Sequence, residues 1–158
     1  MLDPGRYLIK CKANMGDEEI VLGRRFTASA PVPSIMPAPV VGLSGNSGNK
    51  AGRPEIWYLQ PHVNREGGVE TQFFAEGSSV AAWGDGEVIL AGQQPQGWRL
   101  LPHMGRPDVY SIAFTDTMNV WTLVPEAEHP EDGGKVELKP LEDVDEPMHT
   151  QLFEFVRY

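Results

Sequence analysis

A chain of 158 residues, 41% of them hydrophobic, is long and apolar enough for one domain to bury a core without disulfides or metal ions. Its 22 acidic residues outnumber 13 basic residues, and the resulting formal charge of −9 disfavours nucleic acid and anionic membrane surfaces as partners. Because Cys11 is the only cysteine, no internal disulfide can form, which favours a reducing compartment.

The N-terminal sequence MLDPGRYLIK contains no apolar run of signal-peptide length. Nowhere do roughly 18 uncharged apolar residues follow one another, as a transmembrane helix would require. We therefore expect one domain, residues 1–158, in a soluble, cytoplasmic monomer that binds neither membranes nor nucleic acid.

Short runs rich in β-branched and aromatic residues recur along the chain, and turn-forming residues separate them, among them 17 glycines and 14 prolines. Helical periodicity breaks off after a turn or two, so helix is expected to be a minor component. The strongest candidate strands are Arg6 to Lys12, Glu19 to Arg24, Ile56 to Val63, Val69 to Phe74, Glu87 to Ala91, Trp98 to Pro102, Val109 to Phe114, Val120 to Val124, Lys135 to Leu141 and Gln151 to Tyr158. Two weaker segments, Pro39 to Leu43 and Ser79 to Trp83, bring the expected number to about twelve.

An internal repeat groups these strands into three units. The segment IWYLQPH, Ile56 to His62, resembles GWRLLPH, Gly97 to His103, with Trp, Leu, Pro and His at the same relative positions. The segment LFEFVR, Leu152 to Arg157, keeps only the aromatic and apolar skeleton, and Val120 to Glu126 is interpreted as an inner strand of the third unit. We predict an all-β fold of the β-trefoil class, about twelve short strands in three pseudo-repeats. Three aromatic residues are predicted to be equivalent core residues: Trp57, Trp98 and Phe153.

The segment from Phe26 to Pro39, FTASAPVPSIMPAP, contains four prolines and no charge, and it carries no strong strand signal. Long loops in compact domains are often functional, and prolines reduce the entropy that a loop loses when a partner holds it extended. This composition fits a loop held in another protein's groove, and it equally fits a passive surface loop.

Motifs for catalysis and metal binding are missing from the sequence. Neither VGLSGNSGN nor AEGSSVAA forms a GxSxG nucleophile elbow, and adjacent acids such as Glu131-Asp132 and Glu142-Asp143 are interpreted as solvated loop charge. The four histidines lie far apart without HExxH, CxxC or His-x-His spacing: His62, His103, His129 and His149. We therefore expect no enzyme activity, no cofactor and no metal site.

Several short motifs, taken in order, resemble those of the fungal β-trefoil serine protease inhibitors of mushrooms. They are Pro4-Gly5-Arg6-Tyr7 with alternating apolar residues after it, Leu22-Gly23-Arg24, the repeated tryptophan strands, and Leu152-Phe153-Glu154-Phe155-Val156. The resemblance spans nearly the whole chain. It implies an inhibitor of trypsin-type serine proteases with a role in defence, in which the protease binds one exposed loop like a substrate while the barrel keeps that loop rigid.

Members of this family differ in the loop that they use, so the loop has to be chosen from its residues. Trypsin-like enzymes select Lys or Arg because a buried carboxylate lies at the base of their specificity pocket. The segment Glu142 to Pro147, before the last strand, carries four acids and no basic residue, so this pocket would repel it. Arg25 is predicted to enter the pocket because it opens the proline-rich segment, with Phe26 and Thr27 beside it and Arg24 as the second choice.

Arg65, in the segment VNREGG, is the alternative reactive residue. Arg53 and Arg106 also occupy turn-like segments, but each precedes a proline, which opposes substrate-like binding at the scissile bond.

Two other functions stay open. Carbohydrate-binding trefoils often show Gln-x-Trp repeats, of which Gln96-Gly97-Trp98 is a single instance. Inhibition of cysteine proteases occurs in the mycocypins, which are related mushroom trefoils, and Gly42 to Gly52 is the only comparable glycine-rich segment.

Overall fold

The computed structural model describes residues 2–15, 18–25, 38–44, 52–76, 78–84, 86–91 and 95–158. Over these ranges the chain is built from strands, with one short 3-10 helix, η1 (His149–Gln151), and no helix there is long and apolar enough to cross a membrane. The strands are β1 (Gly5–Met15), β2 (Glu18–Arg25), β3 (Ala38–Pro39), β4 (Val41–Ser44), β5 (Gly52–Pro54), β6 (Trp57–Val63), β7 (Val69–Ala75), β8 (Ser78–Trp83), β9 (Glu87–Ala91), β10 (Gly97–Pro102), β11 (Val109–Phe114), β12 (Asn119–Val124), β13 (Lys135–Pro140) and β14 (Phe153–Arg157). The prediction of an all-β fold is confirmed.

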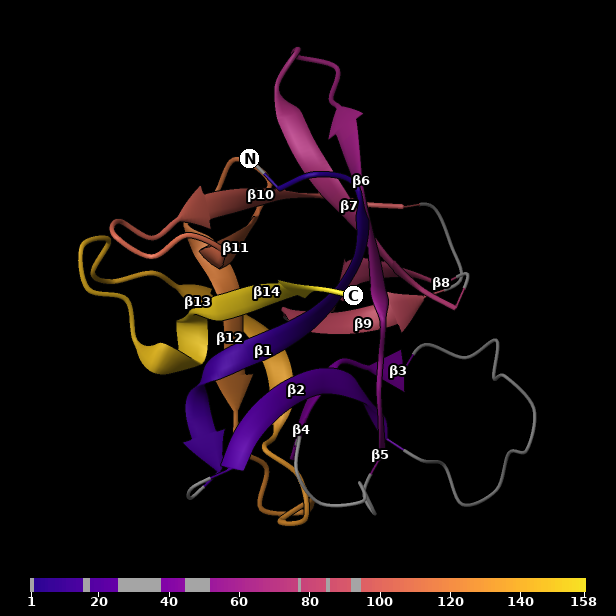
Figure 1. Ribbon diagram of the computed structural model, residues 1–158, viewed down its shortest axis with the longest axis vertical. Helices are drawn as coiled ribbons and strands as arrows, with labels where there is room; N and C mark the ends of the chain where they lie inside the picture. The colour runs from indigo at the N-terminus through magenta and orange to yellow at the C-terminus, as the bar shows by residue number, and fades with distance from the viewer. Residues whose placement is uncertain are drawn as a thin grey trace.

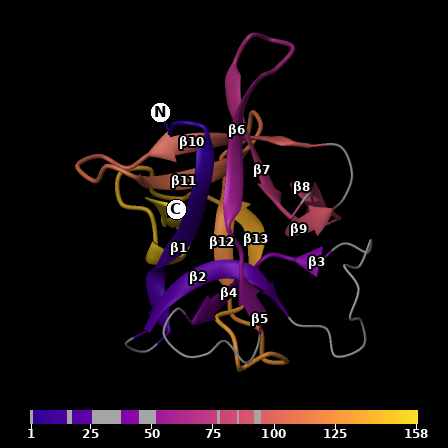
Figure 2. The same cartoon turned by 45° about the vertical axis from the view of Figure 1, so that its right-hand side comes forward.

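The strand pairings close six strands into a ring, and these strands are drawn in Figures 1 and 2. Each pairs antiparallel with the next in the order β1, β6, β7, β10, β11, β14, and β14 pairs again with β1. Alternation along the strands directs one face inward: Tyr7, Ile9 and Cys11 of β1 are buried, whereas Leu8 and Lys10 between them are partly exposed. Closure leaves the ring without a free sheet edge.

Three hairpins extend the ring. They pair β2 with β4, β8 with β9, and β12 with β13, and each starts from a ring strand, β1, β7 or β11. The hairpins also pair with one another, β4 with β13, β9 with β13, and β3 with β9. A six-stranded ring with three equivalent hairpins is consistent with the predicted β-trefoil.

The described residues form fourteen strands where about twelve were predicted, because one predicted strand is divided in two and one further strand was not predicted. The segment Pro39 to Leu43 is divided at Val40, since Ala38 and Pro39 pair with β9 while β4 pairs with β2. The strand that was not predicted is β5, which pairs with β2, and after Glu55 and Ile56 the chain enters β6, which pairs with β1 and β7. Each such change of partner leaves a break in the ladder that local sequence patterns do not reveal.

The core is aromatic, as the repeat predicted. Trp57 on β6, Trp98 on β10 and Phe153 on β14 are fully buried and occupy the same place in the three units. Trp121 lies among them, with its ring centroid 5.4 Å from that of Trp98 and 5.2 Å from that of Phe73. The interpretation of Val120 to Glu126 as an inner strand of the third unit also holds, because β12 pairs with β11 and β13.

Candidate functional site

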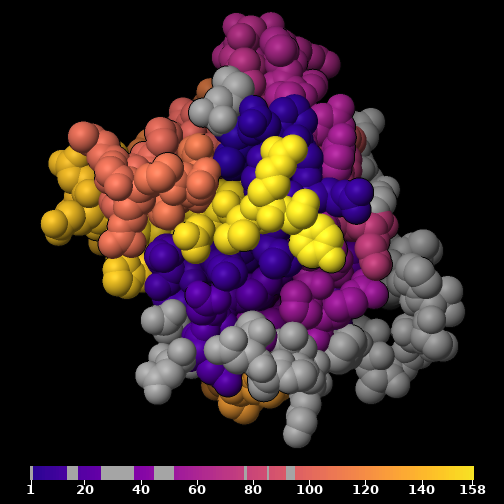
Figure 3. All heavy atoms as spheres, in the orientation of Figure 1, coloured from indigo at the N-terminus to yellow at the C-terminus, as the bar shows by residue number. Residues whose placement is uncertain are grey.

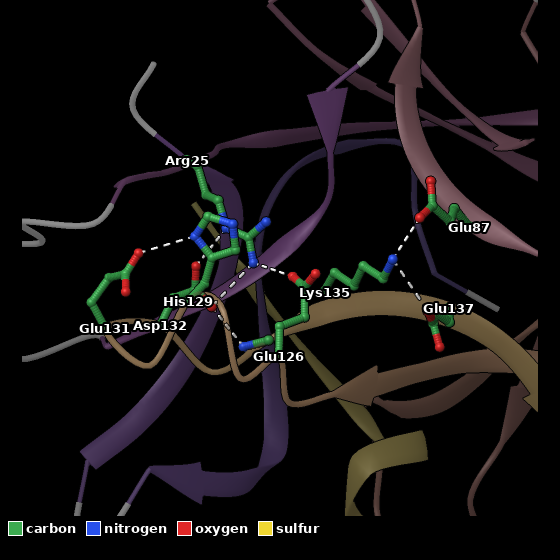
Figure 4. Close-up of polar contacts among 9 residues, drawn as sticks. Arg25, Glu87, Glu126, His129, Glu131, Asp132, Lys135 and Glu137 are labelled. Atoms are coloured by element: carbon green, nitrogen blue, oxygen red, sulfur yellow. Dashed lines mark hydrogen bonds and ion pairs between the residues drawn. The ribbon is translucent and has the colours of Figure 1, made fainter. Parts of the chain in front are cut away.

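Arg25, at the end of β2, is held by two carboxylates from the loop between β12 and β13 (Figure 4). Its Nε donates a hydrogen bond of 2.6 Å to Oδ2 of Asp132, and its Nη2 donates to Glu126. The Arg25 side chain is only 15% exposed and that of Asp132 is fully buried. Arg25 is therefore not the exposed side chain that the sequence suggested. Its ion pairs connect the end of β2 to the loop between β12 and β13.

The charge balance around Arg25 fits this structural role. Burial by itself lowers the pKa of Arg25, but hydrogen bonds and charge from Asp132 and Glu126 outweigh it and raise the pKa above its ordinary value. Asp132 also accepts a hydrogen bond from the backbone N–H of Gly134. The interpretation of Glu131-Asp132 as solvated charge is thus correct for exposed Glu131 and wrong for Asp132, which has a buried cation as its partner.

Arg24 is held in a similar way. Its Nε donates to Oε1 of Glu55 at 2.5 Å, and Glu55 is buried. Arg53 donates to the same carboxylate at 3.2 Å and to Glu76 at 2.6 Å. Phe26 and Thr27, expected beside Arg25, lie outside the described residues, as does most of Gly42 to Gly52, the segment considered for cysteine proteases.

Arg65 is exposed, in contrast to Arg24 and Arg25. It lies in the loop that joins β6 to β7, and Figure 3 shows the tip of this hairpin standing clear of the rest of the surface. A side chain in this position can enter a pocket of another protein without moving any part of the barrel.

Asn64 organises the β6–β7 loop. Its side-chain Oδ1 accepts hydrogen bonds from the backbone N–H of Glu66 at 3.0 Å and of Gly68 at 2.8 Å. Its backbone N–H donates to the carbonyl of Gly68, and its carbonyl accepts from the N–H of Gly67, which has a φ of 83°. Hydrogen bonds to Asn64, the residue before Arg65, therefore hold the backbone that follows Arg65 in place.

The loop is also fastened to the barrel. Asn64 Nδ2 donates to Oε1 of Glu70 at 2.6 Å, and Thr115 Oγ1 donates to Oε2 of the same carboxylate at 2.8 Å. Glu70 is buried on β7, whereas Thr115 follows β11. The buried carboxylate thus joins the loop to a neighbouring unit of the fold.

The loop joining β10 to β11 occupies the equivalent place in the next unit. The repeat that aligns His62 with His103 also aligns Arg65 with Arg106, which is exposed as well. Pro107 follows Arg106, whereas Glu66 follows Arg65. The two loops differ in the residue that would follow the scissile bond.

Two other groups, a buried thiol and a cluster of possible metal ligands, are less suited to a functional role. Burial raises the pKa of the Cys11 thiol to about 11, against the weaker lowering effect of backbone N–H groups of Ala13 and Lys12, so little of the reactive thiolate forms near neutral pH. Ligand atoms of His129, Glu131 and Asp132 lie within 4.8 Å of one another, a grouping that the sequence interpretation did not single out. Asp132 is already neutralised there by Arg25.

Trp98, the residue behind the Gln-x-Trp argument for sugar binding, is fully buried. Its indole N–H donates to the carbonyl of Val80 at 3.2 Å. The Trp98 ring therefore cannot stack on a sugar, and the motif is structural.

No protein-family model matches the chain, and none of the curated proteins matches it in sequence. Among solved structures, it is similar to a proteinase inhibitor from Coprinopsis cinerea, with a TM-score of 0.70 and 22% identity over all of both chains. It is also similar to a ricin B-like lectin from Macrolepiota procera, solved in complex with lactose, with a TM-score of 0.61 and 14% identity over 100% of this chain and 99% of the lectin. The chain shares the fold of both. At these identities the likeness concerns the fold, and any function has to be argued from the residues of this chain.

Proposed function

We propose that this protein is a β-trefoil inhibitor of trypsin-type serine proteases and that Arg65 is the residue that enters the specificity pocket. The observation that carries the proposal is the exposed Arg65 at the tip of a loop fixed by Asn64 on a closed barrel. The structural similarity to the proteinase inhibitor from Coprinopsis cinerea supports the same class of function.

The chemistry of the loop suits binding without efficient cleavage. A guanidinium complements the buried carboxylate of a trypsin-like pocket. Because the loop is already ordered by its own hydrogen bonds, it loses little conformational entropy when it binds. The same bonds hold the residues on either side of the Arg65–Glu66 peptide in place, which opposes separation of the two ends if the bond is cut.

Arg25 is the weaker choice for the inhibitory residue. To insert Arg25 into a protease, the protein would have to break both of its ion pairs and leave the Asp132 carboxylate buried without a counter-charge. Arg65 has no such cost in the described structure, since its side chain is exposed.

Trypsin inhibition by the wild-type protein and two arginine variants tests the proposal. Arg65→Ala should weaken inhibition roughly 30-fold or more, the factor that corresponds to about 2 kcal/mol for an interface anchor. Arg106→Ala is the matched control and should change inhibition less than about threefold, because surface substitutions outside an interface contribute little.

Each possible result has a definite meaning. Full trypsin activity in an excess of wild-type protein would overturn the serine protease proposal, and a parallel assay with papain would then test the cysteine protease alternative. Undiminished inhibition by Arg65→Ala would move the inhibitory residue away from this loop.

A further inference from the structure

Trp83 differs from the other tryptophans of the chain. All four lie within the described residues, and Trp57, Trp98 and Trp121 are fully buried, whereas Trp83 is 59% exposed. It ends β8 at the turn of the β8–β9 hairpin, which lies lower in Figure 1 than the β6–β7 tip. Single exposed apolar side chains are common on protein surfaces, so the exposure of Trp83 becomes informative only together with its surroundings.

Two hollows lie beside Trp83. One has a volume of about 460 Å³ and is bordered by Glu137 and Lys139 of β13, and the other, of about 350 Å³, is bordered by Lys135. Trp83 and Glu87 border both. These volumes lie within the range of small-molecule sites, roughly 300–1,000 Å³.

Backbone hydrogen bonds join residues that line the larger hollow. The N–H of Gly86 donates to the carbonyl of Trp83, and the N–H of Leu138 donates to the carbonyl of Gly86 at 2.6 Å. Gly86 has a φ of 115° and lies against the backbone of Leu138, so a side chain at this position would be strained. Trp83 is therefore presented by a turn that is fixed to β13.

The polar groups around Trp83 are also fixed. Lys135 Nζ donates to Oε1 of Glu87 at 2.5 Å and lies 3.4 Å from Glu137, and Lys139 lies 3.6 Å from the same carboxylate (Figure 4 shows the Lys135 pairs). The hydrogen bond to Glu87 raises the pKa of Lys135, which therefore stays charged at neutral pH. Carboxylates and ammonium groups alternate along the wall next to an aromatic ring.

We infer that Trp83 and the two hollows beside it form a saccharide-binding site. A pyranose presents an apolar C–H face that can pack on the indole, and hydroxyl groups at its edge that donate to carboxylates and accept from ammonium groups. A purely apolar ligand would leave the charged wall unsolvated. A polyanion would meet Glu87 and Glu137 on a protein of formal charge −9.

Tryptophan fluorescence provides a direct test, because Trp83 is the one exposed tryptophan. The wild-type protein is titrated with lactose, cellobiose and N,N′-diacetylchitobiose, and quenching of its emission by acrylamide is measured with and without each sugar. A sugar that binds should shield Trp83 and reduce the quenching, and binding is then quantified by calorimetry.

Variants locate the site. Trp83→Ala should lower affinity for the sugar roughly tenfold or more, as truncation of an aromatic anchor commonly does. Trp83→Phe, which keeps an aromatic face, should retain part of the affinity, and Tyr58→Ala, which removes an exposed aromatic residue outside both hollows, should retain all of it.

Three results would overturn the inference. The first is unchanged quenching with all three sugars, combined with no binding to an array of immobilised oligosaccharides. The second is a sugar affinity that Trp83→Ala leaves unchanged. The third is a loss of sugar affinity in Tyr58→Ala as large as that in Trp83→Ala. The outcome is independent of the inhibitor proposal, since Arg65→Ala should leave sugar binding unchanged and Trp83→Ala should leave trypsin inhibition unchanged.

Discussion

Arg25 joins the end of β2 to Asp132, whose carboxylate is fully buried. Removal of one partner from a buried ion pair leaves an uncompensated charge and commonly costs about 3–5 kcal/mol. We therefore expect Arg25→Ala to lower the free energy of unfolding by about that amount, as measured by urea denaturation. If Arg65 is the inhibitory residue, those Arg25→Ala molecules that are folded should still inhibit trypsin.

Lys10→Ala is the control for Arg25. Lys10 pairs with the exposed Glu19 at 3.0 Å, and exposed pairs contribute about 0–1 kcal/mol. A loss of stability in Arg25→Ala no larger than in Lys10→Ala would show that the buried pair does not stabilise the fold. Loss of inhibition by folded Arg25→Ala would instead return the reactive role to Arg25.

The role of Arg25 could not be derived from its neighbours in sequence. Two adjacent arginines before a proline-rich segment suggest an exposed basic loop, but Glu126 and Asp132 lie 101 and 107 residues further along the chain. A buried ion pair between elements so distant depends on how the hairpins pack. The turn position of Arg65, the alternative reactive residue, could be predicted because its turn signal, Asn, Gly and Gly between two strand patterns, is local.

The β6–β7 loop depends on Asn64 for its rigidity. Asn64→Ala removes both hydrogen bonds accepted by Oδ1 and the bond donated to Glu70. We expect weaker inhibition, roughly tenfold, and faster cleavage of the Arg65–Glu66 bond, because a mobile loop costs more entropy to bind and separates after cleavage. Mass spectrometry of the variant during incubation with trypsin measures the cleavage.

Thr115→Val is a graded comparison for the same loop, since it removes the outer hydrogen bond to Glu70 and leaves Asn64 in place. It should lie between the wild-type protein and Asn64→Ala in both inhibition and cleavage. Inhibition by Asn64→Ala equal to wild type, with no increase in cleavage, would show that the hydrogen bonds of Asn64 do not position Arg65. The turn itself was predictable from sequence, but its attachment to Thr115, 45 residues from Glu70, was not.

At the scale of the whole molecule, the all-β class and the aromatic core could be predicted, because three segments of the chain repeat an aromatic pattern. The repeat placed Trp57, Trp98 and Phe153 in the core, and all three are buried there. The exact number of strands could not be predicted, since partner changes at Val40 and at Glu55 depend on the packing of hairpins from different units. The exposure of Trp83 could not be predicted from the sequence either, because its segment, Ser79 to Trp83, has the small and apolar residues of a buried strand.

Closure of the ring by β14 should decide whether the chain folds at all. β14 pairs with β1 and β11 and brings Phe153 and Phe155 into the core. Loss of a buried phenylalanine costs about 3–5 kcal/mol, so loss of both approaches the total stability of a domain, about 5–15 kcal/mol. Deletion of residues 153–158 should therefore abolish the cooperative unfolding transition seen by circular dichroism, and trypsin inhibition with it. Deletion of Tyr158 alone is the control, because its side chain is exposed and its backbone adds one hydrogen bond, to the carbonyl of Arg6 at 2.9 Å. Cooperative unfolding of the longer deletion near the wild-type midpoint would mean that five strands suffice for the barrel.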